Sequence, residues 1–162
     1  MFTAAEITQS NRLGQGIARN AGGIVTTTIY LHGKAVRVDL SAAAERALAQ
    51  RSAPLYAEVQ LIFGCMIAKR VWFRDATVKG AVPVIPMLSL WFRPARYEKA
   101  CSFDDIDNGA TASDFPLAVE RKLFVPDAVH IDYRAGKWVG DFTYSMEAFR
   151  AQNAVFDRAR MV

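Results

Sequence analysis

The sequence predicts an α+β fold: a mostly antiparallel sheet of about five to seven strands, with two main helices packed on one face. Apolar and polar residues alternate along several short segments, which is typical of half-buried strands. Two pairs of these segments meet at a glycine-containing turn, and each pair is followed by a capped helical pattern. We therefore expect a hairpin-helix unit twice, at 24–51 and 129–158, within a single domain covering 1–162.

The first segment, 1–23, predicts a helix and a flexible connector. Thr3 and Glu6 have capping-box spacing, so a helix is expected from about residue 4 to residue 13. The glycines that follow fit neither a dinucleotide-binding nor a phosphate-loop spacing. This segment therefore predicts no cofactor site.

The alternating residues 24–40 predict the first hairpin. A type II′ turn at Gly33–Lys34 would place Leu31 opposite Val36 and would separate an apolar face from a polar one. Ser41 is then placed to cap an alanine-rich helix that ends near residue 51.

Two longer strands are expected at 55–74 and 87–101, each containing the tripeptide Trp-Phe-Arg. An acidic, irregular connection is expected at 102–127. Part of it resembles a calcium loop, but counting from Asp105 the twelfth position holds Pro116 where an EF-hand needs glutamate. We therefore predict no calcium site there.

The closing residues predict the second hairpin and the second main helix. Placing Arg-Ala-Gly-Lys in the turn sets Tyr133 opposite Trp138 and His130 opposite Asp141. Ser145 is placed to cap a helix that runs to about residue 158.

Charge and hydropathy limit the kinds of partner. Residues 1–99 hold 13 Lys and Arg against 6 Asp and Glu, a net +7, and the remainder holds 7 against 10, a net −3. Such a division can attract an anionic partner or can neutralise itself when the two parts pack together. No apolar run reaches the roughly 18 residues that span a bilayer, and no secretory signal pattern opens the chain, so we expect a cytoplasmic protein without membrane contact.

The cysteines and histidines do not form a metal-binding pattern. Cys65 and Cys101 are the two cysteines, and neither has a second cysteine or a histidine at zinc-finger spacing. We expect Cys65 to pack in the core as a free thiol, and Cys101 to be more accessible, without an activating neighbour in the sequence. The sequence thus predicts neither a metal nor a cofactor.

Five side chains could form a binding surface. In extended strands, alternation places Arg70, Trp72 and Arg74 on one face, and places Trp91 and Arg93 together on one face of their own strand. Such residues could stack nucleic-acid bases and hold phosphates. Because the known motifs of RNA-binding domains are missing, we favour the alternative that these arginines pack over the tryptophans across the strand pair as cation–π pairs.

The arrangement that most resembles an enzyme site is His130 opposite Asp141. A carboxylate can orient an imidazole and raise its basicity, as a hydrolase or transferase requires. A nucleophile would also be needed, and Ser145, Thr143 and Cys101 are available in the sequence. An ordinary histidine on the sheet surface is the simpler interpretation.

The leading functional hypothesis is a cytoplasmic, non-catalytic binding or assembly module, whose partner is another protein or a second copy of the chain. The aromatic residues of 70–74 and 87–93, together with the lack of a complete catalytic or cofactor motif, favour it. Single-stranded nucleic-acid binding and His-Asp catalysis stay as alternatives, and the sequence identifies no substrate.

Overall fold

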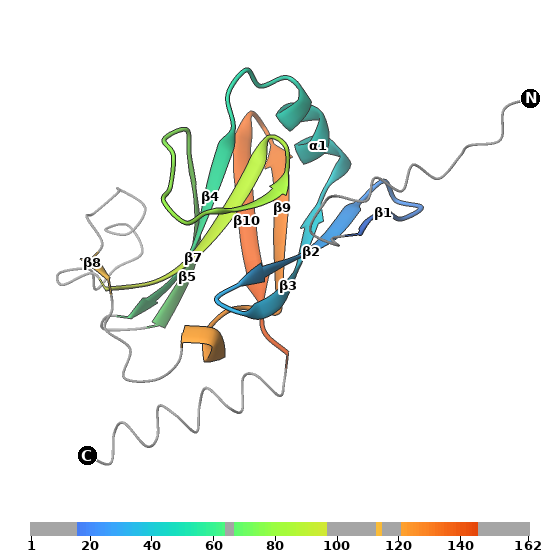
Figure 1. The fold of residues 1–162 in the computed structure, drawn as a ribbon. Coiled ribbons are helices and arrows are strands. Elements are labelled where there is room, and N and C mark those ends of the chain that lie inside the picture. Colours follow the sequence, from blue (N-terminus) through green and yellow to red (C-terminus); the bar gives the residue numbers. More distant parts are fainter. Residues whose placement is uncertain (1–15, 64–66, 97–112, 115–120, 146–162) are drawn as a thin grey trace, which may run out of the picture.

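The structure is a computed structural model that describes residues 16–63, 67–96, 113–114 and 121–145, shown in Figure 1. It is mostly β, with two mixed sheets and one α-helix among these residues. The predicted single sheet with two main helices on one face is therefore wrong. The elements, in chain order, are β1 (Ile17–Arg19), β2 (Val25–Leu31), β3 (Lys34–Leu40), α1 (Ala42–Ala49), β4 (Leu55–Phe63), β5 (Ile67–Arg74), β6 (Val82–Ile85), β7 (Leu88–Arg96), β8 (Ser113–Asp114), the 3₁₀ turn η1 (Arg121–Leu123), β9 (Ala128–Arg134) and β10 (Lys137–Thr143).

The two sheets have the same plan. Sheet A has the strand order β1-β2-β3-β9-β10, and sheet B has the order β5-β4-β7-β6, with β8 paired to the end of β7. In each sheet two antiparallel hairpins are joined by a central parallel pair, β3 with β9 and β4 with β7. Sheet B is built from the consecutive strands β4 to β7, which lie in the sequence between β3 and β9, the parallel pair of sheet A.

The inner faces of the two sheets share one hydrophobic core. Burial alternates along β2 and β3, so that every second side chain points away from solvent. In the other sheet β7 alternates over residues 88–93, whereas β4 is buried along nearly its whole length, and both supply the opposing layer. Members of the buried cluster from both sheets include Ile29, Val36, Val38, Leu40, Val59, Leu61, Leu88, Leu90, Phe92, Val129, Ile131 and Phe142.

The sheets approach each other most closely where β10 packs on β5. A methyl group added to Gly140 of β10 would lie 2.7 Å from Val71 Cβ and 3.0 Å from Phe73 Cζ of β5. Glycine is therefore required at position 140 by the separation of the sheets. Lys69 ties the same edge together, because its Nζ donates to the Phe142 carbonyl at 2.6 Å.

Helix α1 covers one end of the sandwich, and η1 lies at the other end (Figure 1). Ser41 caps the helix as predicted, since its hydroxyl oxygen accepts from the Ala44 N–H at 3.0 Å. Ala44 and Leu48 are buried and extend the core. The predicted helices at 4–13 and 145–158 lie, apart from Ser145, outside the described residues, as do Cys65, Cys101 and most of the connection 102–127.

The turn of the first hairpin differs from the prediction. His32 and Gly33 both have positive φ, 48° and 81°, which is the signature of a type I′ turn, and Leu31 pairs with Lys34. The His32 ring explains why a non-glycine residue accepts this conformation. Its Nε2 lies 3.1 Å from the Phe92 carbonyl, to which it can donate, and its ring packs on Trp91. The register differs by two residues, so the predicted division into apolar and polar faces still holds.

The second hairpin has the predicted register. Tyr133 is paired with Trp138 and His130 with Asp141. Ala135 and Gly136 occupy the turn with φ of 49° and 75°.

The segment expected to be one strand at 55–74 is two. β4 and β5 form an antiparallel hairpin in which Glu58 lies opposite Trp72, and β4 separates β5 from β7. The two Trp-Phe-Arg tripeptides therefore lie on either side of β4. Among the described residues, no helix is long and apolar enough to cross a membrane.

Candidate functional site

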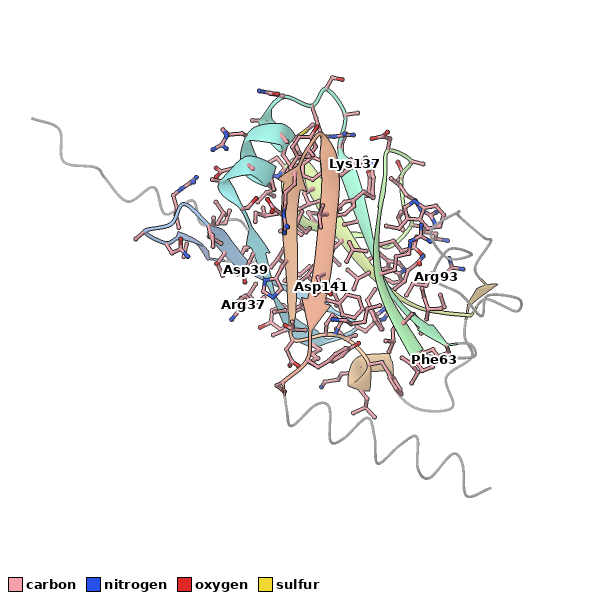
Figure 2. All side chains as sticks on the ribbon, turned by 180° about the vertical axis from the view of Figure 1, so that it is seen from behind. Arg37, Asp39, Phe63, Arg93, Lys137 and Asp141 are labelled. Atoms are coloured by element: carbon pink, nitrogen blue, oxygen red, sulfur yellow. The ribbon has the colours of Figure 1, made fainter. Side chains whose placement is uncertain are left out.

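The five predicted binding residues lie on the outer face of sheet B, which we name the Arg/Trp face. Arg70, Trp72 and Arg74 come from β5, and Trp91 and Arg93 come from β7. Glu58 and Gln60 of β4 lie between the two groups in the pairing register. Figure 2 shows Arg93 on this side of the molecule and Asp39 and Asp141 on the side of sheet A.

A buried carboxylate occupies the centre of the Arg/Trp face. The Glu58 side chain is 3% exposed, and its two oxygens lie 3.1 Å from Arg74 Nη2 and 3.2 Å from Arg93 Nη1. Gln60 Nε2 donates to the same carboxylate at 2.9 Å. Two of the three arginines on this face, Arg74 and Arg93, thus neutralise a charge within the protein.

The tryptophans of this face also have partners in the protein. The guanidinium carbons of Arg70 and Arg74 lie 3.9 and 4.4 Å from the centroid of Trp72. These cation–π pairs form along one strand, whereas the sequence suggested pairs across strands. Trp91 packs against His32, with ring centroids 4.8 Å apart, and against Gly80.

The outer face of sheet A carries a groove of about 250 Å³. Its polar lining comes from three neighbouring strands and the cap of α1, and consists of Asp39, Ser41, His130, Asp132, Arg134 and Asp141. Ile24 and Val139 contribute aliphatic side chains that are 37% and 40% exposed. The groove runs over the parallel pair β3–β9 and the hairpin β9–β10, so the topology of sheet A creates it.

His130 lies in the middle of this groove and is held by Asp39. The imidazole Nδ1 is 3.1 Å from Asp39 Oδ2, across the parallel pair of strands. Asp141 is opposite His130 in the hairpin register, but its carboxylate binds Lys69 Nζ at 2.9 Å. His130 and Asp141, the predicted neighbours, therefore line one groove. The carboxylate closest to the imidazole is that of Asp39, which the local sequence pattern did not indicate.

Asp39 is itself fixed by two further donors. Thr26 donates its hydroxyl at 2.8 Å and Arg37 donates Nε at 3.1 Å. Its side chain is 18% exposed, so the carboxylate forms part of the groove floor. When the neutral His130 ring donates Nδ1–H to this acceptor, the lone pair is on Nε2.

Asp132 and Ser41 form a second fixed pair in the groove. Asp132 accepts from the Ser41 hydroxyl at 2.5 Å, from the Tyr133 N–H at 2.8 Å and from Arg134 Nε. The hydrogen bond from Ser41, followed by that from Arg134, lowers the pKa of Asp132, although its partial burial acts in the opposite direction. Asp132 is therefore ionised at neutral pH.

Asp141 stands at the edge of the groove, and its side chain is 64% exposed. Burial by itself raises the pKa of this group, but hydrogen bonds from Lys69 and the Phe142 N–H and the nearby positive charge of Lys69 bring the pKa below its usual value. The groove thus contains a carboxylate that is both ionised and accessible.

The available nucleophiles do not reach the imidazole. Within the described part of the chain, no hydroxyl or thiol is hydrogen-bonded to His130. Ser41 serves as helix cap and as donor to Asp132, and the Ser145 N–H donates to Asp127 at 2.6 Å. Thr143 is exposed and pairs with Ala128, two pairs along the hairpin from the His130–Asp141 pair.

The residues that sequence reasoning missed are Asp39, Ser41 and Asp132. Alternation with buried neighbours did indicate an outward orientation for Asp39 and Asp132, and Asp132 lies two residues from His130 on the same strand. What brings Asp39 and Ser41 to β9 is its parallel pairing with β3, for which the sequence carries no local signal. No group of three or more metal-binding side chains occurs among the described residues.

Comparison of the chain with protein-family models, with curated proteins and with solved structures finds no match.

Proposed function

We propose that the protein is a non-catalytic binding module and that the groove on sheet A is its ligand site. The observation that carries this proposal is a concave surface in which ionised and hydrogen-bonding groups stand between two exposed aliphatic side chains, Ile24 and Val139. Concave sites that combine apolar walls with a few fixed polar groups are typical ligand sites.

The Arg/Trp face supports ligand binding less well. Arg74 and Arg93 neutralise the buried Glu58, and Arg70 and Arg74 lie over Trp72. A nucleic acid that used these groups would have to compete with contacts inside the protein. In the groove on sheet A, the exposed aliphatic side chains can contact a ligand without breaking a contact inside the protein.

The proposal is tested with a small library of cationic, neutral and anionic fragments, monitored by amide chemical shifts of the isotope-labelled protein. We expect saturable shifts at residues of β9 and β10 that line the groove. Val139→Lys should weaken the binding at least fivefold, because it places a long charged side chain in the groove. Tyr30→Lys is the matched control, since Tyr30 is 60% exposed on the same face and does not line the groove. If no fragment of any charge shifts these residues, the proposal is wrong.

A hydrolase or transferase with His130 as general base is the second candidate. The Asp39–His130 contact favours it, because an anchored carboxylate that orients Nδ1 is the usual support of a catalytic histidine. A panel of activated esters tests it. Turnover that is lost in His130→Gln would replace the binding proposal, whereas turnover that persists in that variant, or no turnover, would reject this candidate.

A further inference from the structure

Building on the proposed binding function, we propose that the groove on sheet A binds the guanidinium group of an arginine side chain in a basic peptide. Two properties of the groove favour this ligand: the hydrogen-bonding groups that it leaves open, and its aliphatic walls.

The open hydrogen-bonding groups around His130 are acceptors, while Arg134 at the rim of the groove donates its Nε to Asp132. Asp141 presents an exposed carboxylate, and His130 Nε2 carries a lone pair when Nδ1–H is donated to Asp39. The hydroxyl of Ser41, by contrast, is already donated to Asp132. A ligand that fits must therefore supply several donors on a single group. Guanidinium supplies five N–H donors and no acceptor.

The aliphatic walls match the stem of a long cationic side chain. Arginine buries its methylene groups along apolar surface while its charged head makes polar contacts. Ile24 and Val139, both more than a third exposed, are the side chains of the groove that can take up such a stem.

Cations of the protein already contact all three carboxylates of the groove, Arg37 at Asp39, Arg134 at Asp132 and Lys69 at Asp141, and the ligand must compete with them. Arg37 is 56% exposed, Lys69 is 42% exposed and Arg134 is 70% exposed. Ion pairs between exposed side chains contribute little, because water and salt screen them. A guanidinium held by acceptors and by aliphatic contacts at the same time can therefore replace Lys69 at Asp141.

The experiment compares blocked arginine amide, blocked lysine amide and blocked citrulline amide on the full-length chain, by amide chemical shifts. Citrulline has nearly the shape of arginine without its charge. We expect arginine to bind at least tenfold more tightly than citrulline, with lysine between them, and the shifts to lie along β9 and β10. Asp141→Asn should weaken arginine at least fivefold. Asp75→Asn, which removes a 79%-exposed carboxylate outside the groove, should leave the affinity unchanged.

The outcomes separate this inference from the proposed function. Citrulline binding as tightly as arginine, or a neutral or anionic fragment occupying the groove while arginine does not, would overturn the guanidinium assignment and leave the binding module standing. A groove that no probe of any charge occupies would overturn both. The comparison of arginine with citrulline uses the unmodified protein, so it remains decisive even if Asp141→Asn does not fold.

Discussion

His130 Nδ1 lies 3.1 Å from Asp39 Oδ2, across the parallel strands β9 and β3. The hairpin partner of His130 in the register, Asp141, instead binds Lys69 from the opposite sheet. A residue in an inner strand has a neighbour on each side, and the sequence of a hairpin indicates only one of them. The second neighbour here determines which nitrogen of the imidazole is oriented.

The first prediction concerns the tautomer of His130. Asp39→Asn should reduce the population of the Nδ1–H form of the neutral ring, because an amide accepts this hydrogen bond less well than a carboxylate. Asp141→Asn should change it much less, since Asp141 contacts Lys69. The nitrogen chemical shifts of the neutral imidazole report the tautomer. An equal effect of both substitutions would contradict the assigned role of Asp39.

The hairpins illustrate what the sequence could predict. In the second hairpin the turn contains Ala135 and Gly136, and the strands alternate regularly, so the register followed from local chemistry alone. In the first, His32 adopts positive φ and moves the turn by one residue. The contact that stabilises this conformation is made with Phe92 in the other sheet, which lies far away in sequence. The alternation still predicted the faces, because a shift of two residues preserves them.

The arrangement of strands into two sheets was not predictable in the same way. Alternation tells which side chains are buried but does not tell against which sheet they pack. The parallel pairs β3–β9 and β4–β7 depend on contacts between distant segments, which alternation does not predict. The groove on sheet A lies over β3–β9, so its complete lining was not predictable either. His130, Asp132 and Asp141 belong to one hairpin, whereas Asp39 could not be linked to them from the local sequence.

The second prediction concerns the closest approach of the two sheets. Gly140→Ala should destabilise the protein by about 1–3 kcal/mol, because the new methyl group would overlap Val71. Combining it with Val71→Ala should recover part of this loss by opening the space. Gly16→Ala is the control, since no atom lies within 4 Å of a methyl group there. Urea unfolding measures all three, and an unchanged midpoint for Gly140→Ala would show that the sheets can separate freely at this edge.

The third prediction concerns the buried carboxylate of the Arg/Trp face. Glu58→Gln should lower the free energy of unfolding by about 3 kcal/mol, the lower end of what removing one partner of a buried ion pair costs. The lower end is expected because Arg74 and Arg93 are 35% and 23% exposed and can partly rehydrate. Asp75→Asn, at an exposed ion pair, should cost less than about 1 kcal/mol. Equal losses would mean that Glu58 is not the electrostatic centre of this face.

The fourth prediction concerns acid stability and Asp127. Burial acts to raise the pKa of this carboxyl, but hydrogen bonds from the Ser145 N–H and Lys34 and the charge of Lys34 lower it below 3.8. A carboxyl with a lowered pKa in the folded state stabilises the fold above its unfolded pKa and loses this effect as the pH falls through the folded value. Asp127→Asn should therefore reduce the loss of stability between pH 5 and pH 2. Lys34→Met should act in the same direction.

Urea unfolding at a series of pH values measures this difference. The variants are compared with the unmodified protein, because other carboxylates contribute equally to all three curves. A variant curve parallel to that of the unmodified protein throughout the acid range would contradict the role given to Asp127.

The fifth prediction concerns nucleic acids. Arg74 and Arg93 bind Glu58, and two guanidiniums cover Trp72, so we expect no saturable binding of single-stranded oligonucleotides to the Arg/Trp face at moderate salt. Phosphate contacts weaken steeply as salt increases. Fluorescence anisotropy at about 50 and 200 mM salt therefore distinguishes them from other association. Tight binding at low salt that falls steeply and is lost in Arg70→Gln would show that this face can exchange its internal partners for phosphates and bases, and the groove on sheet A would then no longer be the better supported site.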